Sequence, residues 1–180
     1  WVLRAMHGAE SFGAWVVVVH AATYGDDRTM ATARVIESLA RIREEAERSS
    51  LRAFIGLETA GRKAAWGTVP EILAVMDEVP GVLPVLDFAH LHARGPPLDQ
   101  DSLGRLLRSL PAAPRLHCHL SGIEFTSAGE RRHLRLGEGL DHRMVLDALR
   151  SAGVEATVIC ESTSPLEDAR GIAGYLAQVI

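Results

Sequence analysis

Five short apolar runs divide the chain, and each carries a side chain of a type that binds metal ions at its last or next-to-last residue. They occupy residues 15–20, 54–58, 82–87, 115–120 and 157–161. Short continuous apolar runs are typical of strands that are buried on both faces of a parallel sheet. We therefore expect five strands, with most of their side chains inside the protein.

The segments between these runs carry apolar residues at helical spacing. In one of them Val35, Leu39 and Ile42 fall on a single helical face, which is typical of an amphipathic helix. Thr68 is a favourable N-cap for the next helix, because Pro70 and Glu71 follow in its first turn. Helices are predicted over residues 1–9, 28–48, 69–79, 102–109, 143–152 and 165–179. The glycine-rich stretch that follows the fourth strand is expected to be a long loop.

Strands that alternate with helices form a parallel sheet with right-handed crossovers. The TIM (β/α)8 barrel is the closed form of this arrangement, but it needs eight strands and about 250 residues. The 180 residues are therefore expected to be the C-terminal five βα units of an α/β TIM barrel, forming a single domain over residues 1–180. The chain begins at Trp1 rather than Met, and the first three units are expected to precede it.

The polar residue at each strand end gives the chain its chemistry. In a parallel barrel the carboxyl ends of the strands meet at one face, and ligands collect there. The candidates are His20, Glu58, Asp87, His119 and Glu161. Mixed imidazole and carboxylate ligands suit Zn²⁺ or Mn²⁺. Each residue alone could be an ordinary surface or hydrogen-bonded side chain, but the ordered set predicts a centre with more than one metal ion.

Three further histidines lie close to these strand ends. His90 follows Asp87 in a D-x-x-H spacing that lets both side chains face one cavity. His117 shares a strand face with His119 but lies one layer deeper, so it is expected to support the site or the core. His133 lies in the expected long loop, where a histidine is ordinarily exposed to solvent.

The composition is that of an ordinary globular protein, with 47% hydrophobic and 23% charged residues. No apolar stretch approaches the roughly 18 residues of a membrane-spanning helix, and no signal-peptide pattern is present. Cys118 and Cys160 alternate away from the ligand face. Both are therefore expected to be small buried residues in a reducing cytoplasm.

A net charge of −4 argues against a nucleic-acid partner, but carboxylates that bind metal ions make the bare count misleading. Several basic residues follow the strand ends, on the same predicted edge as the candidate ligands. Those that could contact DNA phosphates are Arg62, Lys63, Arg94 and Arg132. The alternative is ordinary solvated loop charge.

Taken in order, the motifs around these residues resemble the endonuclease IV family of zinc-dependent apurinic/apyrimidinic endonucleases, which fold as TIM barrels. The motifs are VVVVHAATY, GLETAG, LDFAH, HCHLSG, GERRHLRLGEG and CESTSP. They run through nearly the whole chain and are similar to a divergent, archaeal-like branch of that family. The resemblance implies hydrolysis of a phosphodiester 5′ to an abasic site in double-stranded DNA, as in base-excision repair.

The resemblance also implies a trinuclear metal site with up to three Zn²⁺ ions, Mn²⁺ being possible. His20 would hold the first zinc, and Glu58 would bridge the first and second. The third ion would be held by His90 and His133. The first pair of sites would be completed by Asp87, His119 and Glu161. Glu58 and Glu161 would be the catalytic residues.

The chain departs from the family pattern at several positions. The family places an Asp two residues before the third-site histidine, where this chain has Arg131 next to Glu130. Glu130 in an E-x-x-H spacing is the expected substitute. An Asn-Asp pair of the family is Ser121-Gly122 here. Another histidine of the first zinc site belongs to an earlier strand. The remaining histidines, His7, His92 and His142, are expected at the surface.

Two other functions remain open at this point. A sugar isomerase or epimerase on a similar barrel also gathers Glu, Asp, His and Glu at strand ends, around a single divalent metal. A non-catalytic remnant or binding module is the third possibility, which Arg131 at a ligand position motivates. No protein partner and no membrane contact can be inferred.

Overall fold

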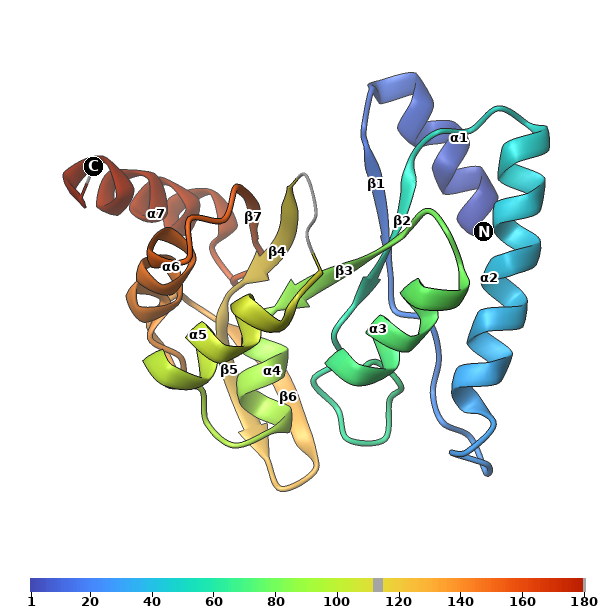
Figure 1. The fold of residues 1–180 in the computed structure, drawn as a ribbon. Coiled ribbons are helices and arrows are strands. Elements are labelled where there is room, and N and C mark those ends of the chain that lie inside the picture. The colour runs from blue at the N-terminus through green and yellow to red at the C-terminus, as the bar shows by residue number, and fades with distance from the viewer. Residues whose placement is uncertain (112–114, 180) are drawn as a thin grey trace. The chain divides into compact units, whose positions relative to one another are not determined.

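The computed structural model describes residues 1–111 and 115–179, coloured along the chain in Figure 1. Contacts between residues divide the chain into two compact units. The first comprises Trp1–Ala60 and Ala64–Val85. The second comprises the short segment Gly61–Lys63 together with the chain from Leu86 onward. The expectation of a single domain stays a prediction.

The first unit is built on three parallel strands. They are β1 (Val16–Val19), β2 (Phe54–Glu58) and β3 (Val82–Asp87), of which β3 is shared with the second unit. Val17 lies opposite Ile55, and Ile55 lies opposite Val82. The helices are α1 (Val2–Phe12), α2 (Ala31–Arg48) and α3 (Val69–Glu78). This βαβαβ order confirms the predicted alternation for this part of the chain.

The amphipathic pattern of this unit is borne out by its core. Val35 and Leu39 of α2 are buried with Ile55 and Leu57 of β2 in one apolar cluster. Thr68 caps α3 as predicted, because its hydroxyl accepts from the Glu71 amide and the Glu71 carboxylate accepts in return from Thr68. This capping box fixes where the chain turns from the loop after β2 into the helix.

The second unit contains two parallel strands, an antiparallel hairpin and four helices among its described residues. The parallel strands are β4 (Leu116–Leu120) and β7 (Ala156–Cys160), with His119 opposite Ile159. The helices are α4 (Phe88–Arg94), α5 (Gln100–Ser109), α6 (His142–Ser151) and α7 (Pro165–Val179). Strand β7 leads into helix α7, whereas β4 leads directly into the hairpin.

The prediction of a long loop after β4 is wrong in part, because this stretch contains a hairpin. Its strands are β5 (Gly122–Thr126) and β6 (Gly129–Leu134). His133, expected in a loop, lies on β6 opposite Ile123. Helix α4, which packs against this hairpin, was also not predicted. Its signal was Asp87, whose carboxylate accepts from the His90 amide as an N-cap.

The segment Gly61–Lys63 is joined to the turn of the hairpin by backbone hydrogen bonds. The Glu130 amide donates to the Gly61 carbonyl at 3.1 Å, and the Lys63 amide donates to the Ala128 carbonyl at 3.0 Å. Arg62 forms an antiparallel bridge with Gly129. The loop after β2 therefore sets the position of the hairpin turn from which Glu130 begins β6.

None of the helices within residues 1–111 and 115–179 is long and apolar enough to cross a membrane. Within the same residues, Cys118 is buried and Cys160 is half-buried, and both are free thiols. Both were predicted to be free thiols. Cys160 is less buried than predicted, because β7 is an edge strand of its sheet. The cytoplasmic location stays a prediction.

Candidate metal centre

Three predicted ligands converge at the carboxyl ends of β3, β4 and β7 in the second unit. These are Asp87, His119 and Glu161, here called the strand-end cluster. One ligand atom from each lies within 4.8 Å of those of the others, and His119 Nδ1 is 3.4 Å from Glu161 Oε1. Asp87 and His119 are buried, whereas Glu161 is partly exposed. A buried carboxylate beside an imidazole is a donor set that suits Zn²⁺ or Mn²⁺.

A second group of ligand-type side chains forms beside it. It consists of His90 on α4 with Glu130 and His133 on β6, here called the hairpin cluster. The Nε2 atoms of His90 and His133 are 3.0 Å apart. The carboxylate of Glu130 lies 3.4 Å from His90 Nε2 and 3.9 Å from His133 Nε2. Glu130 is thus at the position that the sequence suggested for a substitute ligand.

The protonation of the hairpin cluster favours a shared cation. His133 Nδ1 lies 3.0 Å from the backbone oxygen of Glu161. Because a carbonyl oxygen can only accept, this nitrogen is the donor, and in a neutral imidazole His133 Nε2 then presents a lone pair toward His90. If His90 Nδ1 donates in the same way to the Asp87 carboxylate, 3.5 Å away, its Nε2 also presents a lone pair. Two lone pairs and a carboxylate that face one point repel each other unless a cation or a proton lies between them.

Gly61 permits the close approach of the segment 61–63 to this cluster. A Cβ atom at this position would lie 2.6 Å from Glu130 Cβ and 2.8 Å from His90 Cδ2. Real Cβ contacts are essentially never that short, so any larger residue would displace one of the two ligands. Gly61, the last residue of the GLETAG motif, therefore supports the geometry of the hairpin cluster.

Two predicted ligands lie in the first unit. His20 follows β1 and Glu58 ends β2, with His20 Nε2 3.4 Å from Glu58 Oε2. The Glu58 side chain is only 6% exposed, whereas that of His20 is 54% exposed. Burial of a carboxylate is costly without a cationic or hydrogen-bonding partner, which is consistent with a ligand role for Glu58. That both residues join the ligands of the second unit in one centre stays a prediction.

The four residues proposed to contact phosphate lie in the second unit, in two different settings. Arg62 and Lys63 belong to the segment joined to the hairpin turn, and the Arg94 guanidinium donates to the Arg62 carbonyl at 2.7 Å. Arg132 instead donates from Nε to Glu124 at 2.6 Å, and this hydrogen bond holds the pKa of Glu124 below its usual value. Three of the four basic residues therefore border the same turn as Glu130.

The histidines left out of the ligand set differ in burial. His117 packs edge-on against His119, with ring centroids 5.4 Å apart, in line with its expected supporting place. His7 is exposed as expected. His92 and His142, expected at the surface, are half-buried, and burial lowers the pKa of both imidazoles. His92 lies on α4 and His142 begins α6, and in each case the surrounding residues cover part of the imidazole.

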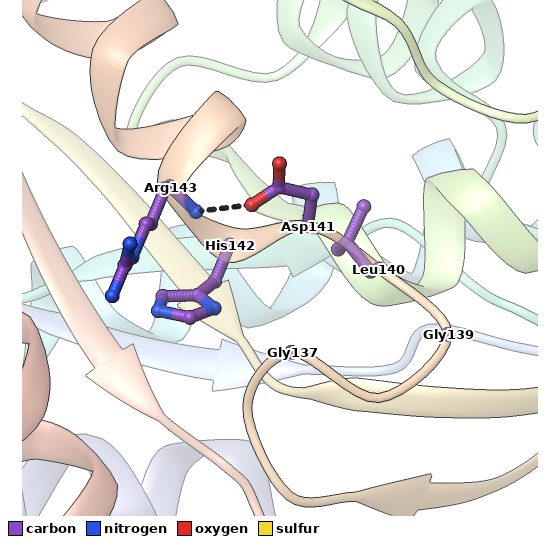
Figure 2. A pocket seen from close by; sticks show the side chains of 6 residues that line it. All are labelled: Gly137, Gly139, Leu140, Asp141, His142 and Arg143. Atoms are coloured by element: carbon purple, nitrogen blue, oxygen red, sulfur yellow. Dashed lines mark hydrogen bonds between the residues drawn. The ribbon is translucent and has the colours of Figure 1, made fainter.

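A separate cavity of about 570 Å³ lies at the start of α6 (Figure 2). It is lined by Gly137, Gly139, Leu140, Asp141, His142 and Arg143. The Asp141 carboxylate accepts from the amides of Arg143 and Met144, so the donors of the helix N-terminus are already satisfied by an anionic group. This cavity contains none of the predicted ligands.

Comparison with known proteins establishes the family. Residues 1–179 match the xylose isomerase-like TIM barrel family, and the chain belongs to it. The predicted fold class, an α/β TIM barrel, is thereby confirmed. The finer resemblance to endonuclease IV stays a prediction, because the solved structures that match include sugar epimerases.

The individual relatives span more than this chain does. An uncharacterized protein of Methanocaldococcus jannaschii is 36% identical over 138 residues, which are 72% of this chain and 50% of that protein. The chain thus spans about half the length of this curated relative. The crystal structure of a D-tagatose 3-epimerase-like protein matches with a TM-score of 0.77 and 19% identity, covering 99% of this chain and 68% of that one.

The IolI protein, solved with a bound zinc atom, matches with a TM-score of 0.64 and 19% identity, covering 89% of this chain and 58% of that one. At such identities the two solved structures establish the fold alone. That this chain is an enzyme and which metal ions it holds stay predictions.

Proposed function

We propose that this chain carries most of the active site of a metal-dependent phosphodiesterase that cleaves DNA at abasic sites. The observation that carries the proposal is the hairpin cluster, in which His90, Glu130 and His133 face one point beside the strand-end cluster. A sugar isomerase or epimerase with a single metal ion has no evident use for this second group. Two neighbouring donor sets are what a phosphoryl transfer with several cations requires.

The chain's own residues would divide the work as follows. The strand-end and hairpin clusters would hold Zn²⁺ or Mn²⁺, with Glu58 as the predicted bridging ligand. Cations held there would neutralise charge on a phosphoryl group and supply hydroxide near neutral pH. Arg62, Lys63 and Arg94 would contact the phosphates on either side of the lesion, and such contacts position DNA without reading its sequence.

A second candidate, a sugar isomerase or epimerase, is favoured by the structural relatives. The family is named for xylose isomerase, and one matching structure is a D-tagatose 3-epimerase-like protein. The three ligand-type side chains of the strand-end cluster would suffice as a one-metal site for such a reaction. Arg131 and Arg132 support this second candidate, because both guanidinium groups pair with Glu124 and are therefore less available to bind a phosphate.

One pair of assays separates the two candidates. The full-length protein is incubated with Zn²⁺ or Mn²⁺ and an end-labelled duplex that contains one abasic site, and in parallel with a set of ketohexoses. Our proposal predicts a nick 5′ to the abasic site that leaves a 3′-hydroxyl a polymerase can extend, lost with a chelator and restored by metal. Epimerised sugar without a nick would establish the second candidate instead.

A further inference from the structure

One aromatic side chain stands exposed on the hairpin that supplies Glu130 and His133. Phe125 of β5 is 40% exposed, although burial of a phenylalanine is ordinarily favourable. It lies opposite Glu130 in the register of the hairpin. The register shifts between Glu124 and Phe125, which is typical of a β-bulge. The exposed ring therefore stands on the strand paired with the one that carries a ligand of the hairpin cluster.

The ring of Phe125 is held in place from the side of α4. Its centroid lies 5.5 Å from that of His92, with the ring planes at 81°, which is a favourable edge-to-face arrangement. The His92 imidazole is fixed in turn, because its Nδ1 accepts from the Leu98 amide at 3.1 Å. An exposed aromatic with a fixed orientation loses little conformational entropy when it binds a flat ligand.

Positive charge borders the same surface. Arg94 ends the helix that carries His92, and its guanidinium donates to the Arg62 carbonyl. Arg62 and Lys63 pair with Gly129 and Ala128 in the turn that joins Phe125 to Glu130. An aromatic ring among cationic side chains is the combination with which proteins bind nucleic acid, since bases stack on the ring while cations accompany the phosphates.

We infer that Phe125 is a stacking contact for the unpaired nucleobase opposite the abasic site. The inference rests on the proposed function and assigns a residue of substrate binding to it. An abasic site leaves the opposite base without a partner, and unstacking such a base costs less than unstacking a paired one. The basic residues at the adjoining hairpin turn, Arg62, Lys63 and Arg94, favour a nucleotide over an uncharged sugar as the occupant.

The test compares F125A, F125W and the control F12A in the full-length protein. Phe12 is 90% exposed on α1 of the first unit and belongs to neither cluster. We expect F125A to weaken binding of an abasic duplex about tenfold, the usual size of one stacking contact, with kcat and bound metal unchanged. F125W should restore binding, and F12A should leave it at the wild-type level.

A fluorescent adenine analogue opposite the abasic site gives a direct readout of stacking. Its emission should be quenched by the wild-type protein and recover in F125A. Unchanged affinity and quenching in F125A, with wild-type cleavage intact, would overturn the stacking contact while leaving the proposed function standing. A wild-type protein that neither binds nor cleaves the duplex would overturn both.

Discussion

The strand-end cluster and the hairpin cluster lie in one unit but arise from different parts of the fold. Asp87, His119 and Glu161 follow three parallel strands, so the barrel architecture itself brings them together. His90, Glu130 and His133 stand on a short helix and an antiparallel hairpin that are additions to the βα repeat. The first cluster follows from the strand ends of the βα repeat, whereas the second arises from elements outside that repeat. Function is therefore better argued from the hairpin cluster.

The largest effect is expected in the strand-end cluster. The substitution Glu161→Gln keeps the shape of the side chain but removes the charge that lies 3.4 Å from His119. Because metal ions supply several kcal/mol of transition-state stabilisation, we expect kcat for abasic-site cleavage to fall about a thousandfold. Steady-state kinetics would measure it, and circular dichroism would check that the fold is kept. Wild-type activity in this variant would remove Glu161 from the site.

The next largest effect is expected in the hairpin cluster. The substitution His133→Ala removes one of the two imidazoles whose Nε2 atoms are 3.0 Å apart. We expect the number of bound cations to fall by one and kcat to fall about a hundredfold, since the strand-end ligands remain. His7→Ala, at an exposed helical position, is the matched control. Equal metal content in His133→Ala and His7→Ala would show that the hairpin cluster binds no cation.

The turn that delivers Glu130 offers a smaller, structural test. Gly129 has a φ of +99°, and a Cβ there would lie 2.2 Å from the Gly61 carbonyl oxygen. We expect Gly129→Ala to lower the free energy of unfolding by about 1–3 kcal/mol and to weaken metal binding by the hairpin cluster more than by the strand-end cluster. Gly153→Ala shares the positive φ of its site but has open space around it. An equal loss in both variants would show that the contact with Gly61 is unimportant.

The smallest effect is expected at Asp168, which is outside both clusters. Its carboxylate accepts from Ser162 Oγ at 2.6 Å and from the Leu136 amide at 3.1 Å. Burial alone would raise its pKa, but these hydrogen bonds and Arg135 outweigh burial and hold the pKa below its usual value. The resulting stability is present above the unfolded pKa of about 4 and is lost as pH falls through the lower folded pKa.

Asp168→Asn should therefore lower the free energy of unfolding by about 1–2 kcal/mol at pH 7, with metal content unchanged. The difference from the wild type should vanish in acid. Denaturant titrations at several pH values would measure it. Glu167→Gln is the control, because Glu167 pairs with the same Arg135 but its side chain is 72% exposed, and exposed pairs contribute little. A pH-independent difference would contradict the assigned role.

The apolar runs correctly placed Asp87, His119 and Glu161 at the ends of parallel strands, and their role as ligands stays a prediction. His90 was indicated by its D-x-x-H spacing from Asp87, and His133 only by the family resemblance. The hairpin itself was missed, since Glu124, Arg131 and Arg132 make the strands too polar to be recognised by their apolar residues. The E-x-x-H spacing suggested Glu130 as a ligand, but the contact between Gly61 and the hairpin turn that positions it could not be predicted from the sequence.

The most direct test of the account is to locate bound cations by anomalous scattering in crystals of the full-length protein grown with Zn²⁺ or Mn²⁺. We predict one peak among Asp87, His119 and Glu161 and a separate peak among His90, Glu130 and His133, the second being absent from crystals of the His133→Ala variant. A single peak at the strand-end cluster, with His90 and His133 joined only by their own hydrogen bond, would contradict the account and favour a one-metal enzyme.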